Sequence, residues 1–157
     1  MDIASYKITN VIIPDDYTPP VFRKTEVKAG EMLCRTGYPL LEDLLATEIR
    51  ENEFVLNMHP TLFVNSGLVG RIRKEIMNDG SCARFIELDS PGLRGQSGGP
   101  LFDVDGKICG MQSRTQHYTL GFNTPSPTYY HVGEAIDAST ICRYLDTLGI
   151  QYSSCIL

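Results

Sequence analysis

Residues 95–101 of this chain read Gly-Gln-Ser-Gly-Gly-Pro-Leu. A serine hydroxyl is a useful nucleophile only where a base can take its proton and donors await the oxyanion, so it must lie on a tight, exposed turn. Glycines on both sides of Ser97 permit the backbone angles of such a turn and a close approach of the substrate. The segment therefore predicts Ser97 as a nucleophile, with the amides of Gly95 and Ser97 forming the oxyanion hole.

Three other interpretations of this segment compete with the first. It could be a plain glycine-rich β-turn. It also fits the nucleophile elbow of α/β-hydrolases, in which the serine leads into a helix, but Pro100 and the hairpin-like stretch at 104–107 continue as strand. The spacing of Gly92, Gly95 and Gly98 resembles a phosphate-binding loop, yet neither a helix nor a lysine follows. The β-turn is the alternative that stays open.

The surrounding sequence predicts short antiparallel strands and a single helix. Asp105-Gly106 is the strongest hairpin signal in the chain, and Asn78-Asp79-Gly80 marks a second turn. Near the C-terminus, Asp137 or Ser139 can cap a helix that Gly149 would end. Several strands with short turns and one terminal helix indicate a small β-barrel or sandwich.

Two stretches are less regular. The proline-rich stretch at 14–20 interrupts any regular element and is typical of a linker. Residues 40–52 are ambiguous, because leucines at helical spacing precede a strand-like run at 53–58.

The composition describes an ordinary globular chain. Its 157 residues fit one domain with a real core, and 42% of them are apolar. A net charge of −5 indicates no nucleic-acid partner. The longest apolar runs are far shorter than the ~20 residues of a membrane span, and the N-terminus lacks the layout of an export signal. We therefore expect a cytoplasmic chain without membrane contact.

The cysteines indicate neither a disulfide framework nor a zinc site, because their number is odd and no two are closely spaced. They are most simply thiols in a reducing compartment, and no metal or cofactor is implied. The five are Cys34, Cys82, Cys109, Cys142 and Cys155.

Residues 95–101 resemble the active-serine segment of trypsin-like serine peptidases, in a form similar to the bacterial HtrA-type branch. The flanking segments agree in order and spacing with the second barrel of that family, and together the matches span most of residues 28–150. The segments are Ser66-Gly67-Leu68-Val69, Phe85 to Gly92, Asp105 to Met111 and Val132 to Ile136.

The resemblance implies an all-β fold. Residues 28–157 would form the second six-stranded antiparallel β-barrel of the trypsin-like fold with its C-terminal helix. Residues 1–13 would be one leftover strand of the first barrel, and residues 14–27 the inter-barrel linker.

The resemblance also implies a catalytic triad of which this chain holds two members. Asp2, in Asp2-Ile3-Ala4, resembles the family's catalytic aspartate, and Ser97 the nucleophile. The triad's histidine should lie dozens of residues before Asp2, so we expect a natural protein that extends upstream by about 60 to 100 residues. As given, the chain should be inert. His59, His117 and His131 are each expected to be surface or packing residues.

By the same resemblance, Gln112, Ser113 and Arg114 form the strand edge that pairs with the substrate backbone. Pro91 occupies the position where family members that cleave after basic residues carry an acid. The specificity pocket should therefore lack a basic preference, unless Glu134 supplies charge from another wall.

These features predict a serine endopeptidase fragment whose partners are a peptide or protein substrate and the missing N-terminal barrel. A non-catalytic peptide-binding module and a serine esterase are the alternatives.

Overall fold

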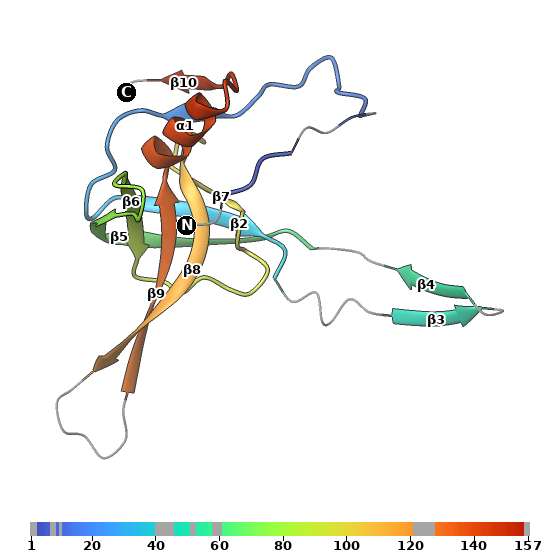
Figure 1. Cartoon of the computed structure of the whole chain (residues 1–157). Coiled ribbons are helices and arrows are strands. Elements are labelled where there is room, and N and C mark those ends of the chain that lie inside the picture. Colours follow the sequence, from blue (N-terminus) through green and yellow to red (C-terminus); the bar gives the residue numbers. More distant parts are fainter. Residues whose placement is uncertain are drawn as a thin grey trace.

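The structure, a computed structural model, describes residues 3–6, 9, 11–39, 46–50, 53–57, 61–120 and 128–155. It is built mostly of strands, with one helix near the C-terminus (Figure 1). In chain order the elements are β1 (Val21–Arg23), β2 (Met32–Gly37), β3 (Ala46–Arg50), β4 (Glu53–Asn57), β5 (Phe63–Ile76), β6 (Cys82–Leu88), β7 (Pro100–Phe102), β8 (Ile108–Leu120), β9 (Thr128–Asp137), α1 (Ala138–Thr147) and β10 (Ser153–Cys155).

Six strands close into a barrel. Strands β8, β7, β2, β5, β6 and β9 follow one another as hydrogen-bonded neighbours, and a pairing between β8 and β9 closes the ring. Every pairing within the ring is antiparallel. The all-β fold with a six-stranded antiparallel barrel and a C-terminal helix is therefore confirmed.

The barrel interior is filled by the inward-facing residues of these strands. Alternate residues of a strand point to opposite faces, and Ile86 and Leu88 of β6 accordingly both enter this core. Burial of each large aliphatic side chain stabilises the fold by about 1.5–3 kcal/mol. The buried cluster comprises Val27, Leu33, Val69, Ile86, Leu88, Leu101, Cys109 and Ala135.

Both predicted turns are present and are held by aspartate side chains. Gly106, between β7 and β8, has φ 76°, and the Asp103 carboxylate accepts hydrogen bonds from the amides of Asp105 and Lys107 at 3.0 and 2.9 Å. Gly80, between β5 and β6, has φ 78°. Such positive φ values favour glycine, which explains why these two turns could be predicted locally.

The helix begins and ends as the sequence indicates. Of the two candidate caps, Asp137 is the one used: its carboxylate accepts a hydrogen bond from the Ser139 amide at 2.8 Å. Gly149, with φ 65°, follows the helix, and the amide of Ile150 donates to the Leu145 carbonyl at 3.0 Å. Helix α1 covers a second apolar cluster that includes Ala83, Phe85, Ile136 and Ile141.

Within residues 1–27, the described strand lies in the second part of the stretch and not in the first. The described residues of the 1–13 stretch form no strand, because no described strand lies beside them to complete a ladder. Ile3 instead packs against the second apolar cluster, while Ile12 is 94% exposed. The expected linker at 14–27 contains β1, which pairs in parallel with β10.

Residues 46–50 and 53–57 form an antiparallel hairpin, β3–β4. The second half of the ambiguous 40–52 stretch is therefore strand, as is the predicted 53–58 run. Residues 40–45 lie outside the described part of the chain.

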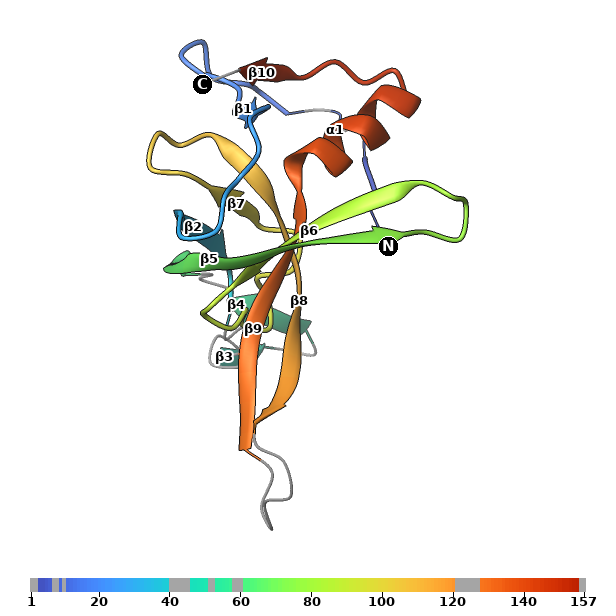
Figure 2. The same ribbon diagram turned by 90° about the vertical axis from the view of Figure 1, so that its left-hand side faces the viewer.

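The two ends of the barrel carry different structures. Helix α1 and the β1–β10 pair lie at one end, and the long β8–β9 ribbon extends from the opposite end (Figure 1, Figure 2). Its ladder continues as far as the pair Leu120 and Thr128.

Candidate active site

Ser97 lies exposed on a tight turn between β6 and β7. Gly95 and Gly98 have φ values of 91° and 85°, the left-handed region that residues with a side chain rarely adopt. A Cβ atom at Gly99 would collide with the carbonyl oxygen of Thr36 in β2. The three glycines thus allow the backbone both to turn sharply and to pack directly on the barrel.

Gln96, whose side chain is fully buried, holds the turn in place through hydrogen bonds. Its amide oxygen accepts a hydrogen bond from the Leu93 amide at 2.9 Å, and its amide nitrogen donates to the Asn65 side chain at 2.8 Å. Gln96 was not predicted as a site residue. A buried amide with both ends bonded fixes the position of the neighbouring Ser97.

Ser97 faces strand β8. Its hydroxyl donates a hydrogen bond to the carbonyl oxygen of Ser113 at 2.8 Å. The amide of Gly98 donates to the Gln112 carbonyl at 2.8 Å, and the Gln112 amide donates to the Gly99 carbonyl at 2.9 Å. The backbone of Gln112 is therefore already bonded. The Arg114 carbonyl accepts from the Gln112 side chain at 2.9 Å, so the edge expected at residues 112–114 is partly occupied within the chain itself.

The amides of Gly95 and Ser97 are open. Among the described residues, neither N–H donates a hydrogen bond to another group. Because an exposed amide can bind an oxygen atom from outside, both N–H groups remain available as donors.

The N-terminal stretch lies beside Ser97. Ala4 contributes to a pocket of about 480 Å³ together with Ser97. Asp2, two residues before Ala4, lies outside the described residues, as does His59. The remaining lining residues are Gly98, Met111, Gln112, Ser113, Arg114 and Ile136.

A buried arginine, Arg35, which the sequence did not predict as a site residue, lies between β8 and the loop that precedes the Ser97 turn. Arg35 in β2 is fully buried, and its guanidinium donates to the side chains of Asn65 at 3.2 Å and Gln112 at 3.0 Å. It also donates to the carbonyl oxygen of Ser90 at 2.6 Å. Burial lowers the pKa of Arg35, and the nearby charge of Asp89 partly opposes this effect.

Pro91 belongs to a loop that lies against β8. The carbonyl oxygen of Gly92 accepts a hydrogen bond from the Thr115 hydroxyl at 2.8 Å. A Cβ atom at Gly92 would collide with the side-chain amide of Gln112. Pro91 is thereby held close to this part of β8.

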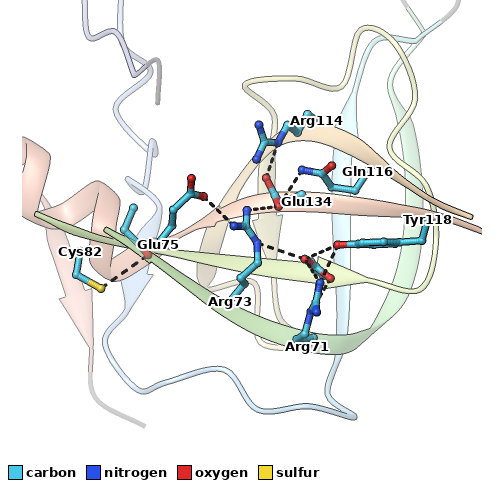
Figure 3. Close-up of polar contacts among 10 residues, drawn as sticks. Arg71, Arg73, Glu75, Cys82, Arg114, Gln116, Tyr118 and Glu134 are labelled. Atoms are coloured by element: carbon cyan, nitrogen blue, oxygen red, sulfur yellow. Dashed lines mark hydrogen bonds and ion pairs between the residues drawn. The ribbon is translucent and has the colours of Figure 1, made fainter. Parts of the chain in front are cut away.

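The charge of Glu134 is neutralised by arginines. Its carboxylate is fully buried and receives Arg73 and Arg114, each at 2.7 Å (Figure 3). Its cross-strand partner Glu87 is bonded to Arg71 at 2.8 Å. The hydrogen bond to Glu134 raises the pKa of the Arg73 guanidinium. Glu134 therefore has no free charge to offer a substrate.

The two described histidines are remote from Ser97. His117 and His131 are cross-strand partners, with their Nδ1 atoms 2.5 Å apart. His117 lies four residues beyond Ser113 along β8, which is roughly 13 Å. Neither imidazole is within hydrogen-bond reach of the Ser97 hydroxyl.

Within the described ranges, no group of three or more His, Cys, Asp or Glu side chains could hold a metal ion. Nor does any helix in those ranges have the length and apolar character that a membrane crossing requires.

Comparison with known families agrees with the fold. The family model of the trypsin-like peptidase domain matches residues 1–111. This is more than half of the 157 residues, and the chain belongs to the family of trypsin-like peptidase domains. A search among curated proteins finds no match.

Among solved structures, the chain is similar to Rv3671c from M. tuberculosis H37Rv, crystallised as a serine-to-alanine mutant in its inactive form. The two chains are 16% identical with a TM-score of 0.55, and the match covers 85% of this chain. At this identity the likeness concerns the fold alone. The chain spans 55% of the length of that Rv3671c chain.

Proposed function

We propose that this chain is the nucleophile-bearing part of a serine endopeptidase. The Ser97 hydroxyl attacks the carbonyl carbon of a peptide bond and passes its proton to a base, and the amides of Gly95 and Ser97 hold the oxyanion. The base then returns the proton to the leaving amine, and water hydrolyses the acyl-enzyme. One observation supports the proposal: an exposed serine lies on a tight glycine turn in which the amides of Gly95 and Ser97 donate to no described group, and its hydroxyl faces Ser113 of β8.

The base in this proposal is a histidine other than His117 and His131, because those two are bonded to each other on the ribbon. Asp2 orients that histidine. The position of Ala4 in the Ser97 pocket supports this role, since it brings the N-terminal stretch to the nucleophile. The absence of an imidazole beside Ser97 among the described residues is also the observation that favours the alternative, a peptide-binding module that does not cut.

A fluorophosphonate probe tests the proposal, because it labels only activated serines. The 157-residue chain should react no faster than its Ser97→Ala variant. A version of the protein that includes the triad histidine should be labelled rapidly, and only when Ser97 is present. Rapid labelling of the chain alone would refute the assigned base, and an unlabelled longer protein that still binds peptides would favour the binding module. Matched peptide and ester substrates then separate peptidase from esterase.

A further inference from the structure

The outer part of the β8–β9 ribbon carries two histidines opposite each other (Figure 2). His117 of β8 and His131 of β9 are direct cross-strand partners, and both side chains are exposed. Directly opposite residues of an antiparallel pair have their Cβ atoms about 4.5–5.5 Å apart, and their side chains stand on the same face of the sheet. The two imidazoles can therefore reach a common point.

The two rings face each other through the same nitrogen atom. Nδ1 of His117 is 2.5 Å from Nδ1 of His131, the ring centroids are 4.6 Å apart, and the ring planes cross at 85°. The ring of Tyr129, two residues before His131 along β9, lies 6.4 Å from the His131 ring. Within the part of the chain that the structure describes, neither imidazole has another hydrogen-bond partner.

This close approach of two ring nitrogens requires a positive centre between them. A neutral imidazole carries hydrogen on one nitrogen and a lone pair on the other. Two lone pairs at 2.5 Å would repel, so either a shared hydrogen or a metal ion has to lie between the two Nδ1 atoms. The neutral imidazole is also the commonest metal ligand among protein side chains. The pair thus supplies the donor atoms of a two-histidine metal site.

The charges around the pair do not oppose a cation. Tyr118 and Tyr130 each follow or precede one of the histidines directly, so their side chains point to the opposite face of the ribbon. Arg71, whose guanidinium donates to the Tyr118 hydroxyl at 2.7 Å, contacts that opposite face. The chain as a whole has a net charge of −5. A metal ion held by the imidazoles would have the ribbon between itself and this arginine.

We propose that His117 and His131 form a zinc site, with both Nδ1 atoms as ligands and water in the remaining positions. Zinc–nitrogen bonds of about 2.0–2.1 Å in a tetrahedral arrangement place the two nitrogens about 3.3 Å apart. The rings reach that separation from 2.5 Å by small rotations of two exposed side chains. With the metal on Nδ1, the hydrogen of each ring is on Nε2.

The ligand atoms select the class of metal. Imidazole nitrogen suits zinc, copper, iron and nickel, whereas magnesium and calcium prefer oxygen ligands. Zinc imposes no geometry through its d electrons, so it accepts two protein ligands together with water. The bound ion would join β8 to β9 through side chains as well as through their ladder. This inference does not depend on the proposed peptidase function, because neither imidazole reaches Ser97.

Calorimetric titration of the 157-residue chain with zinc chloride, in an excess of magnesium chloride, measures the affinity. Either His117→Gln or His131→Gln should weaken zinc binding by about tenfold or more, because each removes one of two protein ligands. Thr119→Gln places the same side chain at the next exposed position on this face, and Cys82→Ser removes an exposed thiol that could compete for zinc. Both control variants should bind zinc as the parent does.

Nitrogen NMR of the histidine rings identifies the ligand atoms on the parent chain alone. Zinc should shift the Nδ1 signals of His117 and His131 together, while their Nε2 atoms stay protonated. The proposal is overturned if these Nδ1 signals do not move, or if both histidine variants bind zinc as tightly as the parent. It is equally overturned if Cys82→Ser alone weakens binding, or if magnesium displaces the zinc. Since the spectra need only the parent, they decide the question even if a variant does not fold.

Discussion

Glycines govern the geometry around Ser97 through close packing as well as through backbone angles. Gly99 has an ordinary φ but packs on the Thr36 carbonyl, whereas Gly106 has a positive φ and open space around it. An added methyl group would therefore collide with neighbouring atoms at Gly99, whereas at Gly106 it would only strain the backbone.

We predict that Gly99→Ala lowers the free energy of unfolding by about 2–3 kcal/mol, because the added methyl group displaces β2. Gly106→Ala is the control and should cost only about 1 kcal/mol of backbone strain. Urea denaturation measures both. Equal losses would show that packing against Thr36 contributes little.

Pro91 and Arg35, near the Ser97 turn, are expected to influence which residue the peptidase accepts before the cleaved bond. Pro91 carries no charge, and the buried Arg35 cation lies beside its neighbour Ser90. A substrate lysine or arginine in this region would meet the like charge of Arg35, which the nearby Asp89 carboxylate compensates only in part. We predict that the complete peptidase does not favour basic residues before the cleaved bond, and prefers small or apolar ones. A peptide-library profile measures this, and a strong basic preference would contradict it.

At the scale of elements, strands β6 and β9 place two carboxylates directly opposite each other, a destabilising arrangement unless cations compensate. Arginines from β5 and β8 supply that compensation. The four strands are thereby tied together on the outer face of the barrel.

We predict that Glu134→Gln lowers the free energy of unfolding by about 2–3 kcal/mol, since it removes the shared carboxylate of Arg73 and Arg114. The cost stays moderate because both arginines can turn towards solvent. Glu75→Gln, which also removes a partner of Arg73 but at a 45% exposed side chain, is the control and should change stability by less than about 1 kcal/mol. A Glu134→Gln variant as stable as this control would contradict the prediction.

Strand β1 is joined to the segment before β2 by the Arg23–Glu31 ion pair at 2.7 Å. The hydrogen bond from Arg23 lowers the pKa of the Glu31 carboxyl group. A carboxyl whose pKa is lower in the folded state stabilises the fold above its unfolded pKa of about 4.3. That contribution is lost as the pH falls through the folded pKa.

We therefore predict that Glu31→Gln is less stable than the parent at pH 7, and that the difference shrinks as the pH falls from about 5 to 3. Urea denaturation of both proteins over this range provides the measurement. A difference that is constant over the whole range would show that Glu31 acts through packing and not through its charge.

At the scale of the molecule, features with local causes could be predicted from the sequence. The Ser97 turn, the Asp105-Gly106 hairpin and the Asp137 cap each depend on residues within a few positions of one another. Their order indicated a small barrel or sandwich, and the resemblance to trypsin-like peptidases specified the six-stranded barrel. Arg35 escaped prediction although it occupies an inward position of β2, because its acceptors come from residues 55 and 77 positions away.

The N-terminal stretch shows how much a strand depends on its neighbours. Residues 1–13 have strand-like composition, yet a strand exists only where a neighbour completes its ladder. Conversely, β1 formed inside a presumed linker because β10 lies beside it. Tertiary context decided both cases, and no local pattern contains it.

The parallel pairing of β1 with β10 has a mechanical consequence. Tension applied between the chain before Val21 and the chain after Cys155 would pull the two strands in opposite directions along their length. Their hydrogen bonds would then be loaded together in shear instead of opening one at a time. The barrel and its helix would resist stretching until the β1–β10 pairing breaks.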